Sequence, residues 1–249
     1  MSIKFDFKDN KLDLKKLSLP SRHYYFNDDE NYIKLLNIGE GIFPKDRVKT
    51  SFNLYNSSLV LTTESATKIY PSKKEYGISA FNINIKKSNL EFINDELILY
   101  KNSKYIQTFK LNFDEESTFF YTDILSQGRS FEDFDFISML MKNRFTFNNN
   151  TEYLEKFDIT GKYLKEYIFQ KSSKNRLFAK IYIKTNHNEH FLNTLHLEEF
   201  ESFAYSKHKK IIIGSISSSS MSKLKQNIEY IWKLYRKQLN KKFFVLGKQ

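Results

Sequence analysis

Apolar and polar residues alternate one by one along much of this chain. The alternation is clearest in four segments, 48–54, 81–86, 105–113 and 177–184. When the pattern repeats every two residues, one face of the strand is buried. The Phe and Tyr residues that dominate these segments favour pleated sheets. Stretches rich in Asn and Ser separate the segments and predict turns. We therefore predict a mainly β protein.

The spacing of apolar residues changes near the C-terminus. From Ser220 to Leu239 they recur at helical spacing, which predicts an amphipathic helix over about 220–240. The serines at 217–220 supply N-capping hydroxyls. A weaker pattern predicts one further helix over His190–Phe203. Because we find no Pro- or Gly-rich linker and no repeat, we predict a single domain over residues 1–249, built of stacked, mostly antiparallel sheets.

Composition narrows the class of protein. The 249 residues include no cysteine, so the fold depends on no disulfide, and any bound metal takes nitrogen or oxygen ligands. The first residues lack the charged and apolar regions of a signal peptide, and no apolar run is long enough to cross a membrane. We therefore expect a cytoplasmic protein without a membrane partner.

The net charge of +11, from 40 basic and 29 acidic residues, leaves two classes of partner open. A basic, β-rich module that binds nucleic acid or an anionic surface is the alternative function, and its binding would weaken steeply with salt. Lysine is spread along the whole chain, however, and an acidic protein partner is a better match for such a charge. We therefore expect no nucleic-acid partner.

The common catalytic motifs are missing, so we predict that the protein is not an enzyme. The sequence has no thiol nucleophile, no G-x-S-x-G turn and no H-E-x-x-H pair. The segment 39–41 reads Gly-Glu-Gly but is not followed by the Lys-Ser/Thr pair of a phosphate-binding loop.

His187 and His190 form the densest group of metal-type side chains. Imidazole suits Ni²⁺ and Zn²⁺, and two histidines three residues apart can share one helix face. A solvent-exposed turn between a strand and a helix is the simpler explanation of the same residues, because a lone H-x-x-H is a poorly specific metal signal. The acidic clusters at 28–30 and 132–133 could hold a hard cation or be solvated loops.

Several polar side chains interrupt segments that are otherwise apolar. Buried charges need partners or water, because burying them alone costs several kcal/mol. The polar groups therefore indicate either a hydrated passage inside the protein or structural ion pairs, such as one from Lys68 or Arg129 to Asp123. The residues in question are Thr62, Thr63, Thr67, Lys68, Glu96, Asp123 and Arg129.

Four segments in order resemble the UreD family of urease accessory proteins, also called UreH. The first, 38–47, resembles the family's glycine-rich turn ending in Gly-Asp, with Asp46 as the acidic residue and Lys45 where the family usually has glycine. The second, 61–70, resembles Thr-Thr-Gln-x-Ala-Thr-Lys-x-Tyr, with Glu64 in place of glutamine.

The third segment, 90–100, is similar to Leu-Glu-Trp-Leu-Pro-x-Glu, with Asn94 in place of proline. The fourth, 122–129, resembles an acidic residue followed by Leu-Gly-Arg, and ends in Gly128 and Arg129. The Gly-Glu that often follows in the family is missing, so the substitutes for its glutamate are Glu132, Asp133 or Asp135. Residues 232–236 are similar to the family's terminal helix.

The resemblance implies a urease maturation scaffold that performs no catalysis. On this hypothesis the chain docks on apo-urease, recruits UreF and through it the GTPase UreG, and helps to deliver Ni²⁺. It binds no cofactor tightly and only transient Ni²⁺, and two copies are expected in the accessory complex.

The resemblance and the polar pattern together give three sets of candidate residues. The possible nickel path, with the residues that frame it, comprises Asp46, Thr62, Thr63, Thr67, Lys68, Glu96, Asp123, Gly128 and Arg129. The candidate metal ligands are Asp46, Asp123, His187 and His190. The candidate partner interface is Trp232, Tyr235 and Arg236.

Overall fold

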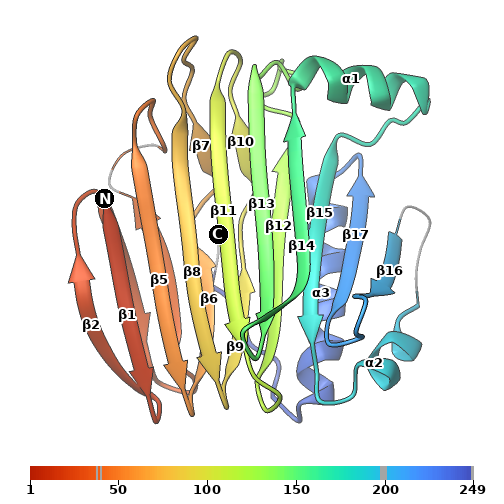
Figure 1. The fold of residues 1–249 in the computed structure, drawn as a ribbon. Coiled ribbons are helices and arrows are strands. Elements are labelled where there is room, and N and C mark those ends of the chain that lie inside the picture. The colour runs from red at the N-terminus through yellow and green to blue at the C-terminus, as the bar shows by residue number, and fades with distance from the viewer. Residues whose placement is uncertain (38, 40, 197–200, 248–249) are drawn as a thin grey trace.

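Two stacked β-sheets form the body of the protein (Figure 1). The computed structural model describes residues 1–37, 39, 41–196 and 201–247. Ile38 and Glu40 of the first family-like segment therefore lie outside the described residues, as do 197–200 of the second predicted helix. The prediction of a mainly β protein is confirmed.

The front sheet in Figure 1 has seven strands. In spatial order they are β14 (Asn150–Ile159), β13 (Ser138–Phe147), β11 (Lys104–Phe113), β8 (Gly77–Lys86), β5 (Arg47–Tyr55), β1 (Ser2–Lys8) and β2 (Lys11–Leu17).

The second sheet has ten strands and lies behind the first (Figure 1). Eight follow one path: β16 (Glu201–Tyr205), β17 (Ile212–Ser218), β15 (Leu177–Lys184), β12 (Thr118–Ser126), β9 (Asn89–Ile93), β6 (Ser58–Thr63), β4 (Tyr32–Asn37) and β3 (Ser21–Phe26). Off that path, β10 (Leu97–Leu99) pairs with both β12 and β7 (Thr67–Ile69).

The sheets are mixed, so the expectation of mostly antiparallel sheets is wrong. Strands β5, β8, β11 and β13 run parallel to one another in one sheet, as do β4, β6, β9 and β12 in the other. The chain crosses repeatedly from one sheet to the other, for example from β5 to β6 and from β8 to β9. Each crossing reverses its direction, so two crossings bring the next strand back parallel to the last one in that sheet.

Aromatic side chains fill part of the space between the two sheets and form an aromatic core there. The rings of Phe109 and Tyr121, from opposite sheets, stack with centroids 3.8 Å apart. Phe52, Phe92 and Phe145 are likewise fully buried in the same core. These residues hold inward positions of the alternating strands, as the period of two predicted.

The C-terminal helix is confirmed as α3 (Met221–Gln238), with the Ser220 hydroxyl accepting from the Lys223 amide at its N-cap. It packs on the outer face of the ten-stranded sheet, against β15 and β17. Among the residues that the structure describes, no helix is long and apolar enough to cross a membrane.

The second predicted helix is shorter than expected, and a third helix was not predicted. Helix α2 covers only Asn188–Thr194, and 201–203, predicted as helix, belong to strand β16. Helix α1 (Gly161–Gln170) begins directly after β14, where the Thr160 hydroxyl accepts from the Tyr163 amide.

Candidate functional site

A cavity of about 390 Å³ lies between the two sheets, next to the aromatic core. Its walls include Thr50, Ser79 and Gln107 from the seven-stranded sheet. Each of these comes two residues before a Phe on the same strand, at 52, 81 or 109. Polar side chains thus stand where aromatic rings stand two residues further along each strand, and they leave open the space that the rings fill there.

Asp123 reaches this cavity from the middle of β12 and is held by neutral donors. The Gln107 amide donates to both of its carboxylate oxygens, at 3.2 and 3.0 Å. Gln107 is oriented in turn by Tyr105, whose hydroxyl donates to its Oε1 at 3.0 Å and lies 2.5 Å from the hydroxyl of Ser79. This chain of hydrogen bonds therefore turns an NH₂ group, not a cation, toward the carboxylate.

Burial raises the pKa of Asp123 to about 6, and the nearby charge of Glu155 adds to the rise. Hydrogen bonds from Tyr121, Gln107 and Asn143 oppose the shift but do not cancel it. At neutral pH the carboxylate is therefore mostly ionised, although only 9% of the residue is exposed to solvent. A buried anion served only by neutral dipoles is a favourable place for a cation.

A row of polar groups continues from Asp123 across the space between the sheets. Asn143 donates to the Tyr182 hydroxyl at 2.8 Å, and Tyr182 donates to Glu155. The ammonium of Lys180 lies 3.0 Å from Glu155, whose side chain is 11% exposed. The row therefore joins the cavity to a second, nearly buried carboxylate on β14.

Sequence reasoning missed Gln107 and Glu155 as candidate residues. The signal for Glu155 was its place on β14 between Tyr153 and Phe157, at an inward position of the alternating pattern. Gln107 holds the same kind of position between Tyr105 and Phe109. A polar residue at an inward position of a strand is thus the sign that both share.

The cavity gathers four of the candidate path residues, namely Thr63, Thr67, Lys68 and Asp123. Thr62 is fully buried beside them, but its hydroxyl donates to the carbonyl of Ile93 at 2.6 Å.

The other candidates for the path lie elsewhere. Asp46 accepts from the Phe43 amide within a turn, and Glu96 pairs with Lys225 at 2.9 Å. Arg129 pairs with Glu132 at 2.8 Å.

The loop after β12 contains all three substitutes considered for the family's glutamate, and Glu132 is the buried one. Glu132 is 8% exposed and packs against Gly128, where an added Cβ would lie 2.8 Å from its own Cβ. The suggested ion pair from Lys68 or Arg129 to Asp123 is not found among the residues that the structure describes. The contacts of Glu132 hold Arg129 on the protein surface.

His187 and His190 lie at the start of α2, in a shallow depression that they share with Lys184, Lys209 and Lys210. Glu115, which pairs with Lys210, and Glu189 line the same depression, but the lysines outnumber these carboxylates and disfavour a bound cation. Across the described part of the chain, no group of three or more His, Asp or Glu side chains is placed to hold a metal ion.

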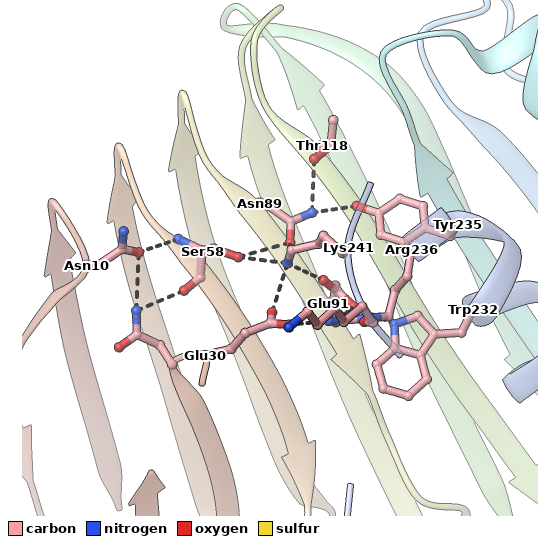
Figure 2. A network of polar contacts seen from close by, with 12 residues as sticks. Asn10, Glu30, Ser58, Asn89, Glu91, Thr118, Trp232, Tyr235, Arg236 and Lys241 are labelled. Atoms are coloured by element: carbon pink, nitrogen blue, oxygen red, sulfur yellow. Dashed lines mark hydrogen bonds and ion pairs between the residues drawn. The ribbon is translucent and has the colours of Figure 1, made fainter. Parts of the chain in front are cut away.

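The candidate interface residues on α3 face the protein's own sheet, around Glu91 (Figure 2). Glu91 is fully buried and accepts from the Trp232 indole and the Arg236 guanidinium, both at 2.6 Å. Lys241 approaches its other oxygen at 2.6 Å, and Glu30 pairs with both Arg236 and Lys241. These side chains fix the helix and present little surface to a partner.

Comparison with known proteins places the chain among urease accessory proteins. A family model described as UreD urease accessory protein matches residues 17–245. The chain is 68% identical to the urease accessory protein UreD of Aliarcobacter butzleri (strain RM4018) over 250 residues, which cover all of both chains. It is 34% identical to the UreD of Bacillus sp. (strain TB-90) over 110 residues, 43% of this chain and 41% of that one.

Proposed function

This chain belongs to the UreD family of urease accessory proteins and acts in urease maturation, and within that role we propose that it passes Ni²⁺ through the cavity between its sheets to apo-urease. The observation that carries this proposal is the placement of Asp123, a buried carboxylate met only by neutral donors in a cavity lined by both apolar and polar side chains. Nickel is the cargo here, not a resident cofactor.

The ligand chemistry of the cavity suits a metal in transit. Asp123 offers carboxylate oxygens, and the threonines at 63 and 67 offer hydroxyls. Ni²⁺ accepts oxygen ligands but is held far more firmly by sets that include several imidazoles or thiolates. A site with one free carboxylate binds the ion loosely enough to release it, because the second carboxylate further along, Glu155, is already paired with Lys180.

The scaffold role completes the proposal. We infer that the chain docks on apo-urease, recruits UreF and through UreF engages the GTPase UreG. The net charge of +11 supports docking on acidic partners, because complementary fields speed and orient association. GTP hydrolysis is assigned to UreG, and two copies of this chain are proposed in the complex.

The test replaces Asp123 by Ala in a strain that co-expresses urease and all accessory proteins. We expect intact accessory complexes, measured by co-purification, together with a lower nickel content and activity of the purified urease. Glu166→Ala, which removes an exposed carboxylate from α1, is the control and leaves both unchanged. Full nickel loading with Asp123→Ala would refute the cavity as a nickel path.

A further inference from the structure

The outer face of the seven-stranded sheet carries most of the protein's excess positive charge. Figure 1 views this face, and helices α2 and α3 lie behind it. Twelve exposed basic side chains project from its strands against three aspartates, of which Asp13 pairs with Lys15 and Asp158 with Lys156, while Asp6 accepts from Asn53. The basic side chains, which we call the basic face, are Lys4, Lys8, Lys11, Lys15, Lys16, Arg47, Lys49, Lys86, Lys110, Lys142, Arg144 and Lys156.

Cations of the basic face stand directly opposite one another on neighbouring strands. The register pairs Lys4 with Lys16, Lys8 with Lys11, Lys110 with Arg144, and Lys142 with Lys156. Like charges directly opposite each other in a sheet are destabilising. Lys156 is relieved by Asp158 at 3.1 Å, whereas the pairs of Lys4 with Lys16, Lys8 with Lys11 and Lys110 with Arg144 have no carboxylate partner among the described residues. A negatively charged surface outside the chain would stabilise these three pairs.

A row of hydrogen-bonded amides crosses the same face from strand to strand. Asn53 donates to Asp6 at 2.7 Å, Asn84 to Asn53 at 2.7 Å, and Asn112 to Asn84 at 2.6 Å. The row spans four adjacent strands, β1, β5, β8 and β11. Side chains already fixed in this way lose little conformational entropy when a partner covers them.

The dimensions of the basic face match a protein interface. Seven strands about 4.8 Å apart span roughly 30 Å, and four outward positions along a strand span about 20–25 Å. The resulting area, about 600–750 Å², approaches the roughly 800 Å² that each partner buries in a standard interface.

We propose that the basic face is a docking surface for an acidic protein surface in the urease maturation complex, an inference that rests on the proposed function for the identity of that complex. An acidic partner would relieve the repulsion within each opposed pair. A second copy of this chain would present the same charge and be repelled. Tyr55 is the exposed aromatic side chain on these strands, whereas single-stranded nucleic acids are held by several stacking rings.

The test reverses one member of three opposed pairs, in the variant Lys4→Glu, Lys110→Glu, Lys142→Glu. Each new glutamate faces a cation, at Lys16, Arg144 or Lys156, so the variant should melt no lower than the wild type. The control is Lys73→Glu, Lys171→Glu, Lys174→Glu, which changes the net charge equally at exposed positions off this face.

The readout is co-purification of the tagged chain with co-expressed urease subunits and accessory proteins, at several salt concentrations. We expect the first variant to lose at least tenfold in retention of one protein component, and the control and wild type to retain it. In the wild type that association should weaken as salt rises.

Unchanged retention of every protein component by the first variant would overturn the inference, provided that the wild type activates urease. So would a loss confined to binding of duplex DNA or of vesicles containing phosphatidylserine. If the wild type itself fails to support urease activation, it is the proposed function that fails, and the two failures are thereby distinguished.

Discussion

Replacing Asp123 by Asn should make the protein more stable at neutral pH while impairing nickel transfer. The substitution keeps the shape of the side chain and an oxygen that can accept from Gln107. The new amide hydrogens have a place to donate, because the buried Oδ1 of Asn143 lacks a hydrogen-bond partner. What the variant loses is the charge, and with it the cost of burying that charge.

The structure sets the size and the pH range of this effect. The pKa of Asp123 rises from 3.8 to about 6, roughly two units, and each unit corresponds to about 1.4 kcal/mol. Because the folded-state pKa is raised, the stabilising contribution of the protonated group is complete below about pH 4 and is lost as the pH rises through 6. Asp123→Asn should therefore gain up to about 3 kcal/mol, or about 6 °C in Tm, above pH 7.

Thermal and urea unfolding of both proteins between pH 4 and pH 8 measures this difference. The two stabilities should coincide near pH 4 and separate as the pH rises. A variant that is less stable than the wild type at pH 7.5, or a gap that does not change with pH, would refute the account of Asp123. Greater stability combined with poor nickel transfer would show that the negative charge of Asp123 serves nickel transfer at the expense of stability.

Two further outcomes follow from the contacts. Glu91→Gln leaves the cations of Arg236 and Lys241 without their buried anionic partner. The variant should therefore lower the free energy of unfolding, measured by urea titration, by about 3–5 kcal/mol. A loss below about 1 kcal/mol would contradict the role given to Glu91 in fixing α3. Replacing both His187 and His190 by Ala should leave Ni²⁺ binding in equilibrium dialysis unchanged, because neighbouring lysines disfavour a cation there, and a measurable drop would restore them as ligands.

Local patterns of the sequence predicted the strands and the main helix, but not how the strands pair. Alternation along 48–54 or 105–113 depends only on which face is buried, so it is visible in one segment alone. Whether β5 lies beside β6 or beside β8 depends on contacts between segments far apart, and nothing local records it. The mixed sheets therefore became apparent only in three dimensions.

The same limit applies to the cavity. Asp123 stood out because a charge interrupts an apolar segment, and the structure places it in the cavity. Glu96 stood out for the same reason but is neutralised by Lys225, more than a hundred residues later in the chain. A single sequence shows which charges need a partner, but not which of them receive one.

Glu91 and Asp123 show how two buried carboxylates can serve opposite purposes. Glu91 is surrounded by Arg236, Lys241 and the Trp232 indole, so an incoming metal ion would have to displace two cations that hold α3 in place. Asp123 meets only amide and hydroxyl groups, and its burial is costly enough to raise its pKa to about 6. A cation that enters the cavity would remove that cost and break no ion pair, which is the physical reason to place the nickel path at Asp123.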